Sequence, residues 1–251
     1  GSGRGIGRAY AQAVALAGAA VIVNDIDADL AHATVTAIKE AGGRAEAVVA
    51  PIGSSEVADQ LVESAVKLFG RLDILCTNAG ILRDRVLWNM SDADFDAVIT
   101  THLRGTFTCA RAAVRRLREQ KEGGRIVVVS SIAGQRGNFG QTNYAAAKAG
   151  IAAFARTWAM ECAKYNITVN AIVPNALTQM TATIPGLSEY AGAIERGEPV
   201  TLPSSLRKGA ALGTAEDVAP LLVFLASDEA KDITGQCVGI GGGKLSFLFP
   251  P

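Results

Sequence analysis

The sequence contains few histidines and no closely spaced cysteines. Only two histidines occur, and the four cysteines (Cys76, Cys109, Cys162 and Cys237) lie far apart, without the spacing of metal ligands. We therefore expect no metal site, and in particular none built on histidine. The dispersed cysteines favour reduced core residues in a cytoplasmic protein over a disulfide framework or a catalytic thiol.

An excess of one charge and long apolar runs are also missing. Lysine plus arginine total 24, as do aspartate plus glutamate. This neutral balance gives no electrostatic footprint for nucleic acid or for an anionic membrane, so neither is predicted as a partner. No apolar run reaches the ~18 residues of a membrane span, and no signal peptide is visible. We expect a cytoplasmic protein that acts on a small molecule.

The length and composition suit one domain with a substantial core. The chain has 251 residues, of which 49% are hydrophobic, and expected strands alternate with expected helices along it. This alternation predicts an α/β fold, a doubly wound and mostly parallel sheet with helices on both faces. No repeat or linker marks a boundary, so residues 1–251 are predicted to form a single domain.

A glycine-rich stretch opens the chain, before an expected helix at Ile6–Leu16. Such a stretch lets the backbone approach a pyrophosphate, which then lies at the positive N-terminus of the helix. Glycine runs alone are weak evidence, since many only form turns. We interpret this one as a dinucleotide contact, made by Gly1, Gly3, Arg4, Gly5, Ile6 and Gly7.

An acidic residue, Asp25, follows the expected strand Ala20–Asn24, about twenty positions after the glycines. A carboxylate there can bond the adenosine ribose hydroxyls and repel a 2′-phosphate, which favours NAD as the cofactor. Arg4 points the other way, because a basic residue in the loop can accompany NADP. Alternatively, Asp25 is only a helix N-cap or a turn residue.

The chemistry is predicted to centre on three polar residues after an expected buried strand, Arg125–Ser130. Ser131 stands at the strand end, and Tyr144 and Lys148 are four apart on an expected helix, which places both on one face. A nearby ammonium lowers the pKa of a phenol, so Tyr144 could exchange a proton with a substrate oxygen. Ser131 could donate a hydrogen bond to that oxygen. An ordinary core tyrosine and a solvated lysine are the alternative.

Together, the glycine motif, Ser131 and the Tyr-x-x-x-Lys motif resemble the short-chain dehydrogenase/reductase family. The resemblance implies a Rossmann-type fold and hydride transfer between nicotinamide and an alcohol or carbonyl carbon. It implies that Tyr144 is the general acid/base, that Lys148 also bonds the nicotinamide ribose, and that Ser131 holds the substrate oxygen.

The same resemblance implies further contacts. Gln141 is a candidate substrate contact beside Ser131 and Tyr144, and Tyr144 and Lys148 would also touch the cofactor. The remaining candidate cofactor contacts are Ile52, Asn78, Ala79, Gly80, Pro174 and Thr178.

Two positions depart from the family pattern. The glycine motif should follow a hydrophobic strand, but the sequence begins at Gly1, so we expect the first strand to be absent and its two neighbours to have unpaired inner edges. Either an upstream segment exists in the natural protein, or the chain is a fragment of doubtful stability. Pro51 stands where the family usually has an aspartate that contacts adenine.

Three features resemble the subgroup containing the (3R)-hydroxyacyl-CoA dehydrogenase domains of peroxisomal multifunctional enzyme type 2. They are the Ile81–Arg85 stretch, Asn175 after an expected strand, and His102 in place of the family's usual asparagine. His102 is a predicted fourth catalytic residue that orders water through one ring nitrogen, or it is purely structural. Arg83 and Arg85 belong to this signature or are ordinary surface charges.

The substrate is predicted from this likeness and from an irregular stretch, Thr181–Gly213. That stretch is either a lid over a hydrophobic substrate or a surface loop; its apolar residues are Ile184, Leu187, Tyr190, Leu202 and Leu206. The favoured substrate is a 3-hydroxyacyl thioester. A hydroxysteroid or another secondary alcohol is the alternative, and a non-catalytic dinucleotide-binding regulator is the alternative of another class.

Alanine-rich faces are expected on two helical stretches, Asp92–Glu119 and Ile151–Tyr165. In the family, the corresponding helices form a dimer by four-helix packing, often extended to a tetramer. We therefore expect a homodimer or homotetramer, although small faces also allow close packing within one subunit.

Overall fold

The computed structural model of the chain describes residues 1–178, 187–190, 193, 198 and 200–248. The strands are β1 Ala20–Asp25, β2 Arg44–Val49, β3 Ile74–Thr77, β4 Gly124–Val129, β5 Ile167–Pro174, β6 Cys237–Gly241 and β7 Lys244–Phe247. The helices are α1 Gly5–Leu16, α2 Ala28–Glu40, α3 Ser55–Phe69, α4 Asp92–Ile99, α5 Gly105–Gln120, α6 Ala133–Arg136, α7 Thr142–Cys162 and α9 Ala215–Ala226.

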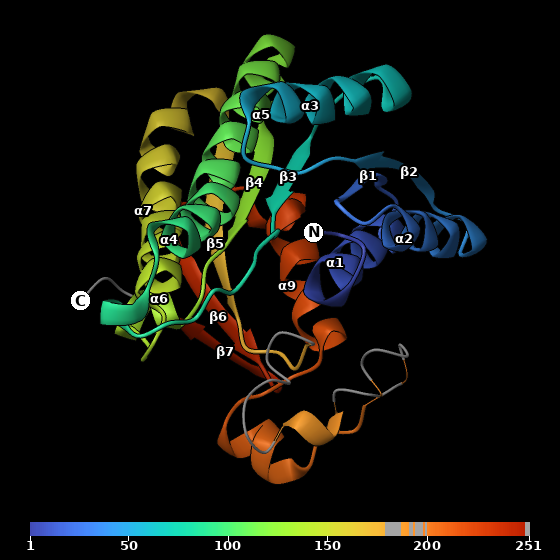
Figure 1. Cartoon of the computed structure of the whole chain (residues 1–251). Helices are drawn as coiled ribbons and strands as arrows, with labels where there is room; N and C mark the ends of the chain where they lie inside the picture. The colour runs from blue at the N-terminus through green and yellow to red at the C-terminus, as the bar shows by residue number, and fades with distance from the viewer. Residues whose placement is uncertain (179–186, 191–192, 194–197, 199, 249–251) are drawn as a thin grey trace.

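The strands form two ladders (Figure 1). β1 and β2 pair in parallel, and β3, β4, β5, β6 and β7 form a five-stranded sheet in that order. Pairing is parallel from β3 to β6, so that Val127 lies between Cys76 and Asn170, whereas β7 runs antiparallel to β6. The prediction of a mostly parallel α/β sheet is therefore confirmed.

Within the described residues, β1 pairs only with β2, and β3 only with β4 and not with β1. The expected unpaired inner edges are thus present. The start of the chain links the carboxyl ends of the two ladders: the backbone nitrogens of Gly1 and Ser2 donate to the Asn24 carbonyl at 2.7 and 2.9 Å. On the other side, Asn78 Nδ2 donates to the Gly1 carbonyl at 3.0 Å.

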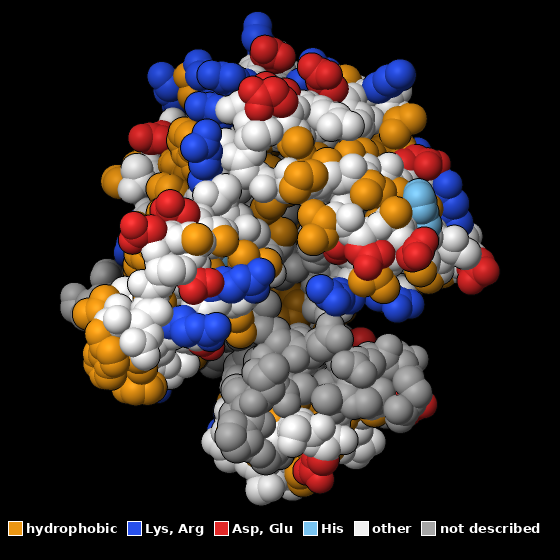
Figure 2. Space-filling view, in the orientation of Figure 1, with side chains coloured by type: hydrophobic (Ala, Val, Ile, Leu, Met, Phe, Trp, Pro, Cys, Tyr) orange, Lys and Arg blue, Asp and Glu red, His pale blue; other side chains and the backbone are white. Residues whose placement is uncertain are grey.

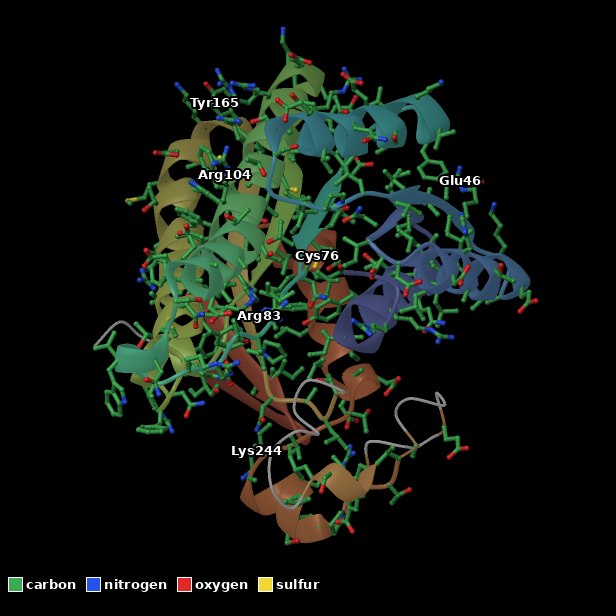
Figure 3. The ribbon with its side chains drawn as sticks, viewed as in Figure 1. Glu46, Cys76, Arg83, Arg104, Tyr165 and Lys244 are labelled. Atoms are coloured by element: carbon green, nitrogen blue, oxygen red, sulfur yellow. The ribbon has the colours of Figure 1, made fainter. Side chains whose placement is uncertain are left out.

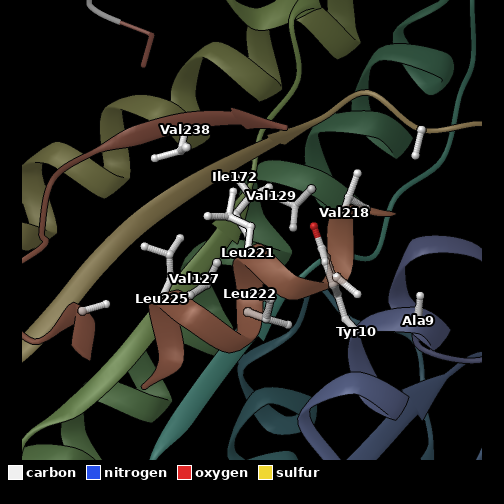
Figure 4. Packing of buried hydrophobic residues seen from close by; sticks show 13 residues of the cluster. Ala9, Tyr10, Val127, Val129, Ile172, Val218, Leu221, Leu222, Leu225 and Val238 are labelled. Carbon is white, nitrogen blue, oxygen red and sulfur yellow. The ribbon is translucent and has the colours of Figure 1, made fainter. Parts of the chain in front are cut away.

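Both faces of the central strands are covered. Val127 and Val129 of β4 pack with α1 and α9 in one buried cluster, which Figure 4 shows from close by. Their neighbours Ile126 and Val128 pack with α5 and α7 in another. Successive residues of a strand point to opposite faces, so the continuous apolar run of β4 supplies two cores. This arrangement is the doubly wound one that the sequence predicts.

Sequence signals account for several helix ends. The Ser54 side chain accepts a bond from the Val57 amide at the start of α3, and Gly70 ends this helix with φ 88°. At the start of α9, Thr214 and Asp217 form a reciprocal capping box. Both caps satisfy amides that the first turn of a helix leaves without an intrahelical partner.

The expected long helix at Asp92–Glu119 is interrupted. α4 ends at Ile99, a π-helical turn spans Thr100–Arg104, and α5 begins at Gly105. A π turn admits an extra residue without breaking the helical path. No glycine or proline precedes Gly105 in this stretch, so the sequence contains no helix-breaking residue that would predict the π-helical turn.

The edge strand β7 carries no clear signal in the sequence. β7 follows β6 after a turn at Gly242 and Gly243, both with positive φ. All four residues of β7 are exposed, so the strand lacks the inward-facing apolar residues that would have marked it in the sequence.

The apolar residues of the irregular stretch pack against one another. Leu202 is buried with Leu177 and Leu212, and Leu187, Tyr190 and Leu206 pack against this cluster. These residues thus pack locally, and that they face a substrate stays a prediction. Ile184 lies outside the described residues.

All four cysteines are free thiols, as predicted. The helices that the structure describes include none long and apolar enough to cross a membrane. Over the same described ranges, no group of three or more potential ligands could hold a metal ion.

We predict that Leu222→Ala, which truncates a side chain only 1% exposed in the α9 core, lowers the free energy of unfolding by about 2–5 kcal/mol. Leu245→Ala on β7 removes a side chain that is 64% exposed and should change stability by about 0.5 kcal/mol or less. Urea denaturation followed by circular dichroism measures both. Equal losses would contradict the assignment of the core.

Candidate active site

Polar residues gather where the parallel strands end. Asn78 follows β3, Ser131 follows the end of β4 by two positions, and Asn175 follows β5. The carboxyl ends of parallel strands meet at one edge of a sheet, which is where ligands of doubly wound folds bind. Helix α7 carries Tyr144 and Lys148 to the same edge.

Lys148 is buried against the end of β4. Its Nζ donates to the Val129 carbonyl at 2.7 Å, and its own carbonyl accepts from the Ser130 hydroxyl at 2.7 Å. The Nζ lies 5.6 Å from the centre of the Tyr144 ring. The predicted sharing of one helix face by Tyr144 and Lys148 is therefore present in the structure.

The direction of the Tyr144 pKa differs from the prediction. Burial raises the pKa of Tyr144, the Asp84 carboxylate adds to the rise, and the interaction with Ser131 opposes it. Burial also lowers the pKa of Lys148 to about 7. Desolvation disfavours the charged form of both groups, so the pKa of Tyr144 is raised overall although Lys148 lies close to it.

His102 lies beside Tyr144, with its ring perpendicular to the phenol and 5.1 Å from it between centres. Its Nε2 is 2.9 Å from the Ile81 carbonyl and 3.0 Å from the Ile81 amide. Burial, helped by the charge of Lys148, lowers the pKa of His102 to about 3, so the ring is neutral. When Nε2 donates to the carbonyl, the buried and unpartnered Nδ1 is an acceptor.

Gly80 makes room for this histidine. A Cβ on Gly80 would collide with His102 Cε1 and lie 2.9 Å from both ring nitrogens. The Asn-Ala-Gly stretch and His102 are therefore fitted to each other, and the glycine is needed for packing rather than for a turn.

The glycine loop is packed against the ends of β1 and β3. A Cβ on Gly1 would lie 2.6 Å from Ala79 Cα, and one on Gly7 would collide with the Gly1 carbonyl. Gly5 has φ 54°, and a Cβ there would meet Thr178 alone, at 3.8 Å. The loop, Ala79 and Thr178 are thus brought together, and their contact with a cofactor stays a prediction.

Asp25 is held ionised beside this loop. Its carboxylate accepts from the amides of Gly3 and Asp27 at 2.9 and 3.1 Å. Burial acts to raise its pKa, but these bonds outweigh burial and the pKa is lowered. The N-cap of α2 is Asp27, whose side chain accepts from the Leu30 amide, so the alternative that Asp25 is itself the N-cap is wrong.

The loop fits a dinucleotide. Helix α1 has no side-chain cap bond at Arg4 and no acidic residue in its first turn, so its N-terminal amides suit a pyrophosphate. The Asp25 carboxylate stands next to them and suits ribose hydroxyls.

The other predicted cofactor contacts lie in different surroundings. Ile6 packs against the α9 core, and Pro174 ends β5 opposite Ile240. Ile52 packs against the cluster of Ala58, Cys109 and Ala112 between α3 and α5. These apolar contacts explain the position of the Ile52 side chain.

Gln141 and Asn143 hold the start of α7. Gln141 Nε2 donates to Asp84 Oδ2 at 2.8 Å. Asn143, which is fully buried, donates to the carbonyls of Arg83 and Asp94 at 3.1 Å each and accepts from the Tyr144 amide. Sequence reasoning missed Asn143; its place directly before Tyr144 was the available signal.

Comparisons with known proteins identify the family of the chain. A family model described as enoyl-(acyl carrier protein) reductase matches residues 1–244. The 3-oxoacyl-(acyl-carrier-protein) reductase of Thermotoga maritima is 39% identical over 98% of this chain and 95% of its own length. The peroxisomal multifunctional enzyme type 2 of Mus musculus is 40% identical over 99% of this chain, which spans 32% of that protein.

A solved structure, a short chain dehydrogenase from Mycobacterium avium, matches with a TM-score of 0.85 and 39% identity. The match covers 100% of this chain and 84% of that one. By sequence, fold and site geometry, the chain is an enzyme that oxidises CH–OH groups or reduces the corresponding carbonyls, and it belongs to the short-chain dehydrogenase/reductase family.

Proposed function

We propose that the protein is an NAD-dependent oxidoreductase of 3-hydroxyacyl thioesters and the corresponding 3-oxoacyl thioesters. The observation that carries this proposal is the gathering of Tyr144, Lys148 and His102 at the edge where β4 ends. The substrate class is supported by relatives whose names specify 3-oxoacyl-(acyl-carrier-protein) and hydroxyacyl-CoA.

In this proposal, Tyr144 donates the proton during carbonyl reduction. Because its pKa is raised by burial, the phenol keeps its proton at neutral pH and can give it to a carbonyl oxygen. The Ser131 hydroxyl would donate a second hydrogen bond to the same oxygen. When bound, the nicotinamide supplies or accepts the hydride.

Lys148 and His102 are proposed to assist proton transfer by the Tyr144 phenol. With a pKa of about 7, the Lys148 amine can change its protonation state near neutral pH. We also propose that this amine forms a hydrogen bond to the nicotinamide ribose. The free Nδ1 of the neutral His102 ring can accept a hydrogen bond from a water. The two groups would together resupply the proton that Tyr144 gives up.

We assign NAD, rather than NADP, as the cofactor. Asp25 is ionised at the end of β1, and a carboxylate at this place repels a 2′-phosphate. The glycine loop with Arg4 and Ile6, the Asn78–Gly80 stretch and Thr178 are proposed cofactor contacts. Ile52, Pro174, Tyr144 and Lys148 complete the proposed set, and Gln141 is a proposed substrate contact.

We further propose that residues 1–251 act as one domain in a homodimer or homotetramer in the cytoplasm. Aromatic side chains lie on the α5 and α7 face: Phe154 stacks on Trp158 at 4.4 Å between centres, and Phe107 lies 6.5 Å from Phe154. Such a face suits the core of a subunit interface. The four free thiols suit a reducing compartment.

Tyr144→Phe should lower kcat for 3-oxoacyl thioester reduction by about 10²–10⁴-fold, because it removes the general acid. NADH binding, measured by calorimetry, should persist. Tyr165→Phe is the matched control and should keep full activity in the same NADH absorbance assay. Substantial turnover by Tyr144→Phe would contradict the mechanism, and turnover of other ketones but of no thioester would contradict the substrate class.

The unmodified protein should use NADH with a kcat/KM about 10-fold or more above that for NADPH, since like charges at a binding site cost several kcal/mol. Asp25→Asn should shrink this ratio by removing the charge. Asp27→Asn is the control, because Asp27 is exposed and asparagine caps helices equally well. A clear preference for NADPH in the unmodified protein would overturn the assignment.

Phe107→Glu should convert the assembly to monomers, because it places a charge among the aromatic side chains of the proposed interface. Phe224→Glu on α9 is the control, with a side chain 44% exposed against 39% for Phe107. Size-exclusion chromatography with light scattering measures the mass, and circular dichroism verifies folding. An unmodified protein that is monomeric, or dissociation only in the control, would refute the interface.

A further inference from the structure

Two arginines follow Ile81 and take no part in the chemistry described above. Arg83 and Arg85 are exposed, and each guanidinium donates to the carbonyl of the preceding residue, at 2.9 and 2.8 Å. A guanidinium has five N–H donors, so most of each fork remains available to a ligand. The ion pairs formed by the described residues include neither arginine.

The backbone that carries these arginines is tied to the start of α7. The Arg85 amide donates to the Gly140 carbonyl at 2.8 Å, and the Arg83 carbonyl accepts from Asn143 Nδ2 at 3.1 Å. Asn143 also accepts from the Tyr144 amide at 2.7 Å. The two guanidinium groups therefore extend from a segment whose position is fixed relative to Tyr144.

Asp84, which lies between the two arginines in sequence, forms a hydrogen bond with Gln141 instead of pairing with them. Asp84 Oδ2 accepts from Gln141 Nε2 at 2.8 Å, across the bridge that pairs Arg85 with Gln141. The Asp84 carboxylate thus serves to dock the segment, and neither arginine forms a salt bridge with it. Two positive charges two residues apart are left facing solvent.

The segment leads outward from the site. Ile81 contacts His102, and the four residues from there to Arg85 span at most ~14 Å. Figure 3 shows Arg83 between α1 and the helices that carry the catalytic residues, and Figure 2 shows basic side chains over the same part of this face. The arginines therefore lie beside the site, within at most ~14 Å of extended chain from the residue that contacts His102.

Building on the thioester substrate proposed above, we propose that Arg83 and Arg85 bind the phosphate of the phosphopantetheine arm that carries the acyl group. Guanidinium forks match phosphate oxygens in pairs of charge-assisted hydrogen bonds. The anchored backbone places both forks before the substrate arrives, which reduces the entropy lost on binding. Coenzyme A and an acyl carrier protein both present this phosphopantetheine phosphate.

The test compares one 3-oxoacyl group on four carriers: N-acetylcysteamine, which has no phosphate, phosphopantetheine, coenzyme A and acyl carrier protein. In Arg83→Ala/Arg85→Ala, KM for the three phosphate-bearing thioesters should rise about 10–100-fold, the loss expected from charge-assisted hydrogen bonds. KM for the N-acetylcysteamine thioester and kcat for all four should stay close to those of the unmodified protein.

Lys67→Ala/Lys231→Ala is the matched control, since it removes the same charge from exposed positions on α3 and after α9. It should leave every KM unchanged. In the unmodified protein, the kcat/KM values for the coenzyme A and carrier-protein thioesters identify which source of the phosphate is preferred, and the double arginine variant should weaken both.

Equal changes for all four thioesters, or no change for any, would overturn the phosphate contact while leaving the thioester activity intact. A rise in KM for the coenzyme A thioester alone would indicate that the arginines contact the nucleotide of coenzyme A. That result would also overturn the proposal. If the unmodified protein turns over none of the thioesters, the proposed function fails and this inference fails with it.

Discussion

The site depends on a lysine buried where an ammonium is costly. Lys148 is held by one hydrogen bond, from Nζ to the carbonyl at the end of β4, and the Ser130 hydroxyl fixes the Lys148 backbone to the same strand. Burial disfavours the charged amine and lowers its pKa to about 7. Tyr144 lies one helical turn earlier, with its ring close to the Lys148 amine. That amine can gain or lose a proton at neutral pH.

Much of this arrangement follows from local sequence patterns. The four-residue spacing of Tyr144 and Lys148 fixes their common face, and the continuous apolar run of β4 signals a strand buried on both sides. The polar residue that ends β1, Asp25, was also recognisable from its distance to the glycines. These features depend on helix and strand periods, which a sequence displays directly.

Other features depend on contacts between distant segments, which no local pattern encodes. The π-helical turn around His102 and the exposed edge strand β7 leave no distinctive hydrophobic spacing. The pKa of Tyr144 rises because the whole fold buries the ring, although the neighbouring lysine alone suggested a fall. Asn143 matters through bonds to residues 49 and 60 positions away.

The account rests on a desolvated lysine below the phenol, and one measurement addresses it directly. NMR titration of selectively labelled lysine side chains, assigned with Lys148→Met, gives the pKa of Lys148 in the cofactor-free protein. The account predicts a value of about 7. A value near the ordinary 10.5 would contradict it, because the amine would then be hydrated and outside the buried site.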